Sequence, residues 1–235
     1  MKKNTAIAIL GGMGPEASVK MLEIMVSMAA REFGAKDGTD FPEILLDSVP
    51  VPDFISNKKK MPIALEMLKE RIIKLNAFNI STYGIACNTA HIILDELEAV
   101  SAAPFTSMID AVSASLKNSK IRKVGILATL STIETGLYQK ALSKYSINVV
   151  FPNSIEINRM EKVIRKIIAG KNLVSDSEKI KEIAESLISR GAEGIILGCT
   201  ELPLIFPKNF SLPVYDSLEI LARSLLENYY GRSGL

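Results

Sequence analysis

Two cysteines, Cys87 and Cys199, are the residues of this 235-residue sequence best suited to chemistry. Each ends an apolar run and is followed by polar residues and an expected helix, in "ACNTAH" and in "GCTELP". At such a position the N-terminal amides of the helix favour the thiolate, which is the reactive form of cysteine. One buried cysteine is most often only packing. Two in matching contexts predict a pair that works together.

A pair of thiols is suited to inverting a stereocentre by proton transfer. That reaction needs a base on one face of the carbon and an acid on the other, and the two groups exchange roles in the reverse direction. The ordinary pKa of cysteine lies close enough to neutrality for both forms to be populated. One histidine and two distant cysteines match no zinc spacing, so we expect no metal.

The segment "GGMGPEAS" fits G-x-G-x-x-A, a pattern found where dinucleotides bind. Pro15 removes one amide donor, and Asp37, the acidic residue about 20 positions on, falls in an expected loop. The sequence therefore favours a tight strand-to-helix turn with Pro15 as the first helical residue. The remaining amides of that turn could bind a smaller anion, such as a carboxylate.

Three polar residues near the cysteines allow more than one interpretation. His91 lies four residues after Cys87, but a Cys–His hydrolase also needs an orienting group and an oxyanion hole, and it gives the second cysteine no role. We interpret His91 as a first-turn helix residue that tunes the site. Glu201 either orients a thiol or favours the start of a helix. Ser131 begins an S-x-x-E capping box and is expected to be structural.

Short apolar runs alternate with amphipathic stretches along the chain, which predicts a doubly wound α/β protein with parallel sheets. The expected strands are Ala6–Leu10, Glu43–Val49, Ser81–Cys87, Phe105–Ile109, Val124–Ala128, Asn148–Phe151, Gly194–Cys199 and Val214–Tyr215. The expected helices are Glu16–Phe33, Ile63–Phe78, Ala90–Glu98, Ala111–Asn118, Glu134–Lys144, Ile155–Ala169, Ser177–Arg190 and Ser217–Tyr229.

The pattern occurs twice, although the similarity between the halves is weak. "IAILGGMGP" is echoed by "KVGILATLST", "YGIACNTAH" by "EGIILGCTELP", and "FTSMIDA" by "LPVYDSL". Each half then carries one cysteine at the carboxyl end of a parallel strand, where open α/β sheets bind their ligands. We expect two similar lobes that face each other across a cleft.

The composition excludes several classes of partner. The formal charge is +2, there is no tryptophan, and Lys58–Lys60 is the one basic block, so no nucleic acid is expected. No apolar span reaches about 18 residues, and the first apolar run stops at glycines, so neither a membrane helix nor a signal peptide is expected. We expect a soluble, cytoplasmic protein with two reduced thiols that acts on a small molecule.

"GGMGPEAS", "ACNTAH" and "GCTELP" together resemble the aspartate/glutamate racemase family that works without pyridoxal phosphate. The resemblance covers essentially the whole chain, and the glycine loop favours the aspartate branch. It implies a cofactor-independent racemase of two flavodoxin-like lobes, present as a homodimer, with the active site between the lobes. The last strand and helix would return to the first lobe, which gives lobes of residues 1–108 plus 212–235 and of residues 109–211.

Carried over by motif, Cys87 and Cys199 would be the two acid/base residues. The implied substrate contacts are Met13, Asn88, Thr89, Thr132, Thr200 and Glu201.

One position departs from the family pattern. Aspartate racemases often have "PDR" after the second strand, with the arginine gripping a substrate carboxylate, whereas this chain has Phe54 there. Either another cation replaces the arginine or the substrate is not a dicarboxylate; the candidate cations are Lys58–Lys60, Arg165, Lys166 and Lys171. The sequence thus predicts an aspartate racemase. The alternatives are a related enzyme for another acid (hydantoin, maleate or amino acids broadly) and a non-catalytic anion-binding protein.

Overall fold

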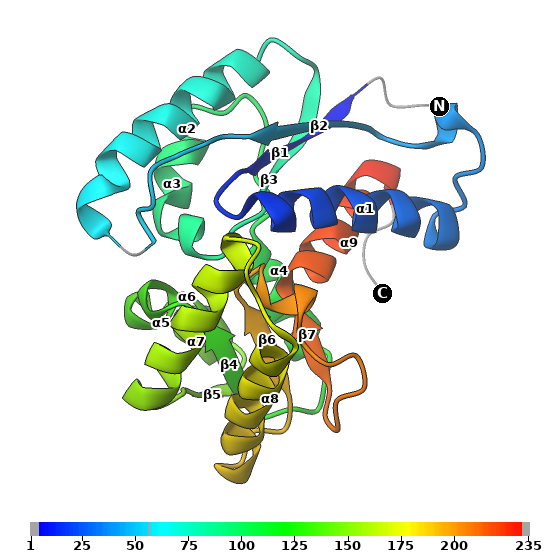
Figure 1. Ribbon diagram of the computed structural model, residues 1–235. Helices are drawn as coiled ribbons and strands as arrows, with labels where there is room; N and C mark the ends of the chain where they lie inside the picture. Colours follow the sequence, from blue (N-terminus) through cyan, green and yellow to red (C-terminus); the bar gives the residue numbers. More distant parts are fainter. Residues whose placement is uncertain (1–4, 56, 232–235) are drawn as a thin grey trace. The chain divides into compact units, whose positions relative to one another are not determined.

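The computed structural model describes residues 5–55 and 57–231 and contains two parallel β-sheets with helices around them (Figure 1). The strands are β1 (Ala6–Gly11), β2 (Glu43–Ser48), β3 (Ile80–Ile85), β4 (Lys123–Ala128), β5 (Asn148–Val150), β6 (Ile195–Gly198) and β7 (Val214–Asp216). The α-helices are α1 (Pro15–Glu32), α2 (Met61–Leu75), α3 (Leu94–Glu98), α4 (Met108–Lys117), α5 (Leu130–Thr135), α6 (Leu137–Ser143), α7 (Ser154–Ile168), α8 (Val174–Ser189) and α9 (Ser217–Tyr230). Short 3₁₀ helices cover Gly38–Asp40, Lys58–Lys60, Thr89–Ile93 and Leu202–Leu204.

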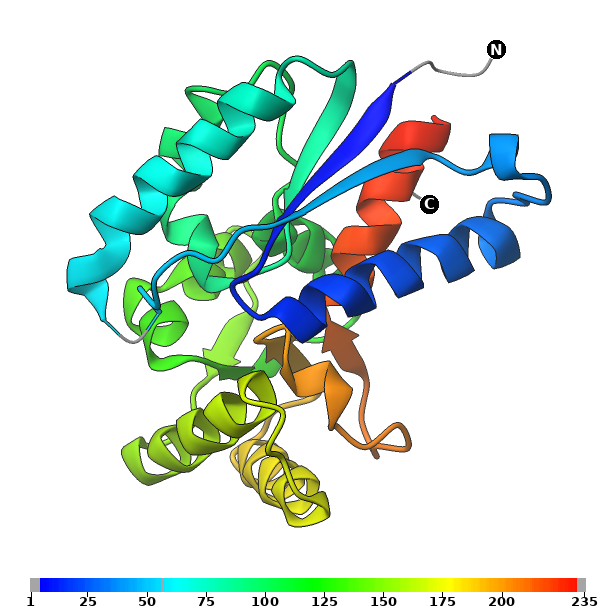
Figure 2. The ribbon, with the colours of Figure 1, turned by 45° about the horizontal axis from the view of Figure 1, so that its top comes forward.

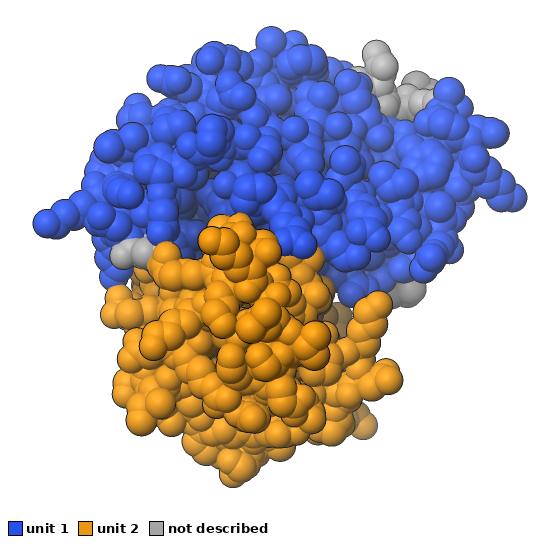
Figure 3. Space-filling view, viewed as in Figure 1, with its two compact units in different colours: residues 1–108, 218–235 blue, residues 109–217 orange. Residues whose placement is uncertain are grey.

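The contacts within the chain divide it into two compact units (Figure 3). The first unit comprises residues 1–108 and 218–235, and the second comprises residues 109–217. The sheet of the first unit has the strand order β2-β1-β3, and that of the second has the order β5-β4-β6-β7. All the pairings are parallel, so the predicted α/β class with parallel sheets is confirmed.

The first sheet is covered on both faces because the buried residues of β1 alternate between two clusters. Ile7 and Ile9 belong to the cluster that includes side chains of α1 and α9, whereas Ala8 and Leu10 belong to the cluster that includes side chains of α2 and α3. In Figure 2, α1 and α9 lie on one side of the strands and α2 lies on the other. A strand buried on both faces reads as one continuous apolar run, as β1 does.

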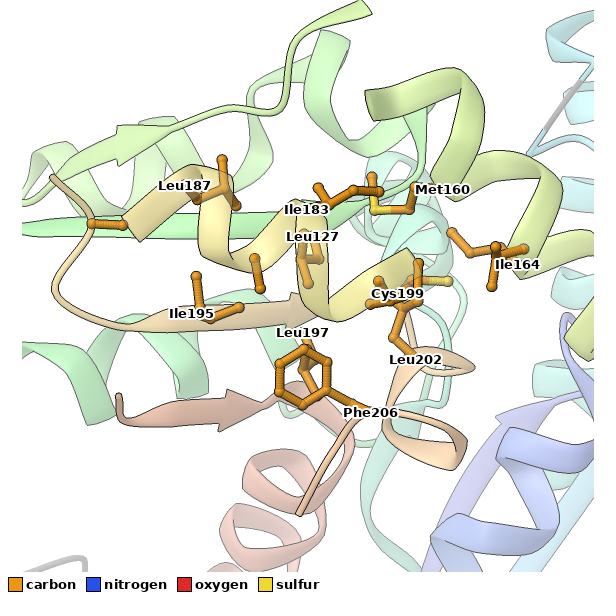
Figure 4. Close-up of a cluster of buried hydrophobic side chains, with 14 of the residues drawn as sticks. Leu127, Met160, Ile164, Ile183, Leu187, Ile195, Leu197, Cys199, Leu202 and Phe206 are labelled. Carbon is orange, nitrogen blue, oxygen red and sulfur yellow. The ribbon is translucent and has the colours of Figure 1, made fainter. Parts of the chain in front are cut away.

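The second sheet buries one face under α7 and α8. Both helices contribute apolar stripes, Met160 and Ile164 from α7 and Ile183 and Leu187 from α8, to a cluster with β4 and β6 (Figure 4). Helix α7 starts at a capping box, because the Asn153 side chain accepts the amides of the first turn. These local signals explain why the sequence predicted both helices to within a few residues.

The two halves of the chain have the same strand topology. In the second half, the sheet order is β5-β4-β6-β7. The strand that comes first in the sequence, β4, therefore lies between β5 and β6. In the first half β2-β1-β3 has the same order, and an isolated parallel bridge between Tyr83 and Phe105 occupies the place of the fourth strand. The weak internal repeat in the sequence therefore corresponds to a repeated fold.

In each half, the helix that follows the fourth strand position (Phe105 in the first half, β7 in the second) belongs to the compact unit of the other half. Helix α4 follows Phe105, yet residues 109–117 lie in the second unit; helix α9 follows β7, yet residues 218–230 lie in the first. Leu221 and Leu225 of α9 are buried in the core of the first sheet. The prediction that the last strand returns with this helix is wrong, because β7 pairs with β6, and residues 212–217 lie in the second unit.

Two other expected elements differ from those observed. Phe105–Ile109 is not a strand: Thr106 donates one backbone hydrogen bond to Tyr83 and the chain enters α4 at Met108. The single helix expected over Glu134–Lys144 is two helices, because Gly136 adopts φ +66° and ends α5. Helix α5 also begins earlier than predicted, with Thr129 rather than Ser131 as its N-cap.

Candidate active site

The glycine loop between β1 and α1 is a tight turn closed by Ser18. The amide of Gly12 donates to Ser18 Oγ at 2.9 Å, and that hydroxyl donates to the carbonyl of Gly14 at 3.1 Å. Gly12 has φ +89°, and a Cβ there would collide with the backbone of Val49. Pro15 is the first residue of α1, as the sequence predicted. The Gly12 amide is thus used inside the turn, and the first-turn amides of α1 remain as donors for an anion.

Cys87 follows β3 at the carboxyl edge of the first sheet. Leu10 and Ile85 are register partners, so β1 and β3 end side by side and bring the glycine loop to the same edge as Cys87. Cys87 is 4% exposed and shares a buried cluster with Met13. Asn88 and Thr89, the next two residues, are also buried. The predicted site residues of the first half therefore gather at one edge.

His91 contacts the backbone on both of its ring nitrogens. Nδ1 lies 2.9 Å from the carbonyl oxygen of Cys87, and the amide of Met108 donates to Nε2 at 3.0 Å. Since a carbonyl can only accept, Nδ1 carries the proton and the imidazole is neutral. The ring is bonded to the carbonyl of Cys87 rather than to its sulfur. His91 thus fastens the cysteine turn to the start of α4, which favours the positional role over a Cys–His base.

Phe54 lies in the core of the first unit. It is 1% exposed and belongs to the same buried cluster as Met13 and Cys87. The cluster is apolar, and Phe54 contributes a hydrophobic ring to the cluster that also holds Cys87. A buried aromatic ring cannot form the bidentate contacts that a carboxylate receives from arginine.

The candidate cations of the second unit are engaged on helices α7 and α8. Lys166 Nζ lies 3.2 Å from an oxygen of Asp176, a fully buried carboxylate that also receives Lys179. Arg165 pairs with Glu161 one turn earlier. In the first unit, Lys58–Lys60 forms an exposed 3₁₀ turn. Lys171 is exposed after α7. The run Lys58–Lys60 is therefore exposed to solvent, as is usual for lysine side chains.

Cys199 follows β6 and donates a hydrogen bond to a buried carboxylate. Its Sγ lies 3.0 Å from Oε2 of Glu201, and the Thr200 hydroxyl donates to the same oxygen at 3.2 Å. Cys199 and Glu201 are 5% and 4% exposed. Figure 4 shows Cys199 beside Leu202, at the end of the apolar cluster away from Ile195. Of the two interpretations of Glu201, the contact with the thiol is the one observed.

The carboxyl edge of the second sheet carries the remaining predicted residue. Ala128 and Gly198 are register partners, so the turn after β4 lies beside the turn that holds Cys199. Thr132 is buried in the first turn of α5, where its amide donates to the hydroxyl of Thr129 and its own hydroxyl accepts from it. The second half thus repeats the arrangement of the first, with a cysteine turn next to a strand-to-helix turn.

A tyrosine near Cys199 was missed by sequence reasoning. Tyr138 on α6 is 1% exposed, and its burial holds its pKa far above the ordinary value, although a hydrogen bond with Ser217 opposes the shift. The charge of Asp216, and that of Cys199 when its thiol is ionised, raises this pKa further. Tyr138 is therefore a neutral hydroxyl at this edge. The one signal in the sequence is Gly136, a residue type that often ends a helix and that here separates α5 from the helix of Tyr138.

Three general findings bear on the class of site. In residues 5–55 and 57–231, no three His, Cys, Asp or Glu side chains gather as ligands for a metal ion. Within the same residues, no helix is long and apolar enough to cross a membrane. Neither Cys87 nor Cys199 forms a disulfide.

Comparisons with known proteins agree with this architecture. A model of the Asp/Glu/hydantoin racemase family matches residues 10–225. The aspartate racemase of Picrophilus torridus is 32% identical, with a TM-score of 0.83 and coverage of 96% of this chain and 94% of that chain. An aspartate racemase homologue of Pyrococcus horikoshii is 30% identical, with a TM-score of 0.79 and coverage of 95% and 98%. A broad-specificity amino-acid racemase of Bacillus subtilis is 25% identical, with coverage of 95% and 97%.

The fold is thus the α/β fold with parallel sheets of these racemase structures. This chain belongs to the Asp/Glu/hydantoin racemase family, as its three motifs predicted. The matched residues include the glycine loop and both cysteine turns.

Proposed function

We propose that this protein is a cofactor-independent amino-acid racemase in which Cys87 and Cys199 are the two acid/base residues. In one direction, one sulfur as thiolate takes the α-proton and becomes a thiol, and the other thiol donates its proton to the opposite face and becomes a thiolate. The reverse reaction exchanges these roles. The observation that carries the proposal is the repeated topology, which presents one buried thiol at the carboxyl edge of each sheet.

The neighbours of each thiol support the proposal. Asn88 and Thr89 beside one cysteine, and Thr132 and Thr200 near the other, supply neutral hydrogen-bonding groups suited to a carboxylate or an amino group. The first-turn amides of α1, next to Met13, would bind the α-carboxylate. Aspartate is the leading candidate substrate, because two solved relatives at 30% and 32% identity carry the name aspartate racemase or aspartate racemase homologue.

Phe54 favours a second candidate, a racemase of broader specificity. Because this ring is buried in the apolar cluster with Cys87, the side chain at position 54 offers no charge for a second carboxylate. Side chains without charge would be accepted there. The broad-specificity relative from Bacillus subtilis, which matches 95% of this chain, is in line with this candidate.

The test is exchange and inversion of the α-proton in heavy water without added pyridoxal phosphate. Native protein is expected to racemise aspartate, or neutral amino acids if the second candidate is right, with incorporation of solvent deuterium. Cys87→Ser and Cys199→Ser should each lower racemisation by about 100-fold or more, the usual contribution of a positioned acid or base.

The two serine variants control for each other. Each retains one thiol, so each should still exchange the α-proton of one enantiomer, and the two variants should differ in which enantiomer that is. Far-UV circular dichroism checks that both are folded. Racemisation that survives either substitution would exclude the two-thiol mechanism. If no amino acid exchanges its α-proton, the anion-binding alternative is favoured instead.

A further inference from the structure

The chain passes between its two compact units at two places, directly after Met108 and directly after Ser217. In the first half, the imidazole of His91 bonds both the amide of Met108 and the carbonyl of Cys87, at 3.0 and 2.9 Å. The point where the chain leaves the first unit is thereby fastened to the cysteine turn. The second half has no histidine, because His91 is the single one in the sequence.

Two buried hydroxyl groups make the corresponding connection in the second half. The Ser217 hydroxyl donates to the carbonyl oxygen of Leu197, on β6, at 2.7 Å. That bond uses the one proton of the serine hydroxyl, so in the hydrogen bond between Ser217 and Tyr138 the tyrosine is the donor. Tyr138 is 1% exposed and Ser217 is fully buried. A directed chain of hydrogen bonds therefore runs from α6 through Ser217 to β6.

This hydrogen-bond chain ends next to the turn of Cys199. Only Gly198 separates Leu197 from Cys199 in the sequence. Glycine has the widest backbone freedom of all residues, so the turn keeps one position only if the strand is held firmly just before it. Hydrogen bonds in the buried interior are stronger than those in water, and both bonds of the chain are of this kind. Tyr138 is also near enough to Cys199 to interact with the charge of its thiolate.

We propose that Tyr138 is a positioning residue that, through Ser217, fixes the carboxyl end of β6 and with it the turn of Cys199. It is the counterpart, in the second half, of His91 in the first. The inference rests on the proposed racemase function for its catalytic meaning, because an acid or base must be held at one face of the α-carbon. The fastening of the Cys199 turn itself does not depend on the reaction.

The test measures alkylation of Cys199 and Cys87 by iodoacetamide, followed by peptide mass spectrometry, with no amino acid present. Both thiols are buried, so the reagent reaches each one after a local opening, and the alkylation rate reports how often that opening occurs. Tyr138→Phe keeps the aromatic ring and removes the hydroxyl. We expect the rate at Cys199 to rise about fivefold, the effect of one buried hydrogen bond, and the rate at Cys87 to stay unchanged.

Ile195→Val separates a local effect from a loss of overall stability. Ile195 belongs to the same buried cluster as Cys199 but lies at its other end (Figure 4). Deleting one buried methylene costs about as much stability as losing one hydrogen bond. The rate at Cys199 should therefore rise clearly less in Ile195→Val than in Tyr138→Phe. Equal acceleration in the two variants, or an unchanged rate in Tyr138→Phe, would overturn the proposal.

Ser217→Ala interrupts the hydrogen-bond chain in the middle, and it also serves if Tyr138→Phe does not fold. It should raise the alkylation rate of Cys199 at least as much as Tyr138→Phe does. Because the tyrosine acts through the serine, the double variant should react no faster than Ser217→Ala alone. Effects that multiply would show that the two hydroxyls act independently, and they would overturn the proposal, as would an unchanged rate in Ser217→Ala.

Racemisation kinetics test the catalytic meaning of the same contact. A misplaced acid or base lowers kcat with little change in KM, so Tyr138→Phe is expected to lower kcat about tenfold. An unchanged kcat, or a change confined to KM, would overturn the positioning role. If the native protein does not racemise, the proposed function fails, while alkylation still decides whether Tyr138 fastens the turn. Unchanged alkylation in a protein that racemises refutes the positioning role alone.

Discussion

Replacement of His91 tests whether the imidazole fastens the cysteine turn or acts on the thiol. Nδ1 of the ring donates to the carbonyl of Cys87 at 2.9 Å, and Nε2 accepts from the amide of Met108 at 3.0 Å. Both hydrogen bonds are buried. Removing a partner from a buried backbone group costs about 1–3 kcal/mol. His91→Ala removes both partners and leaves a cavity, so we expect a loss of about 3–5 kcal/mol in the stability of the first unit.

Two amide variants separate the two contacts. The side-chain amide of asparagine overlies Nδ1 and can still donate to the carbonyl of Cys87, whereas that of glutamine overlies Nε2 and can still accept from Met108. His91→Asn should therefore lose protection of the Met108 amide against hydrogen exchange by about tenfold or more, equivalent to about 1.4 kcal/mol. His91→Gln should keep most of it.

Hydrogen exchange is the suitable assay because it reports on one amide, whereas global unfolding of a two-unit chain need not be two-state. Far-UV circular dichroism serves as the check of overall folding. The reasoning is refuted if His91→Ala leaves exchange at Met108 unchanged, or if the asparagine and glutamine variants lose protection equally. Alkylation of Cys87 should change little in the glutamine variant; its abolition there would show that the imidazole acts on the sulfur.

Three further substitutions test the glycine loop and a buried ion pair. Gly12→Ala combines φ +89° with a collision against the Val49 backbone and should cost about 3–4 kcal/mol in thermal unfolding, while Gly34→Ala, at φ +79° in open space, should cost about 1–2 kcal/mol. A similar loss for both would show that the collision relaxes without cost. Lys179 and a backbone amide lower the pKa of Asp176 from 3.8 to about 2, so its ionised form stabilises the fold above pH 4. Asp176→Asn should lose about 1 kcal/mol near neutral pH, discounted for the solvent-exposed lysines, and the difference should vanish as the pH falls from about 4 to 2; a difference that persists at pH 2 would contradict the assignment.

The sequence predicted much of the fold because the signals concerned are local. An apolar run such as that of β1 indicates a strand buried on both faces, and Pro15 after the glycines indicates the start of α1. Predictions were poorer where a single residue redirects the chain. Gly136 splits an amphipathic stretch into two helices, and the start of α4 at Met108 leaves Phe105 as a bridge in place of a strand.

The site was only partly accessible from sequence, for a related reason. The two cysteine turns could be found because each follows an apolar strand in a recognisable motif. One hydrogen-bond partner of His91, the amide of Met108, lies 17 residues along the chain. Tyr138, on α6, is close enough to Cys199 to interact with its charge, although 61 positions separate the two residues in the sequence. Periodicity and local spacing carry no record of contacts between such distant segments.

The sequence by itself determined the α/β class, the internal repeat and the two cysteines, because burial patterns and turn chemistry act within a few residues. Tertiary structure decided which unit holds α4 and α9, since a helix packs where its apolar stripe is best buried and the chain order does not prescribe that place. It also decided that Phe54 is buried and that Glu201 faces the Cys199 thiol. Both placements follow from how side chains pack once the chain has folded, which local sequence patterns do not encode.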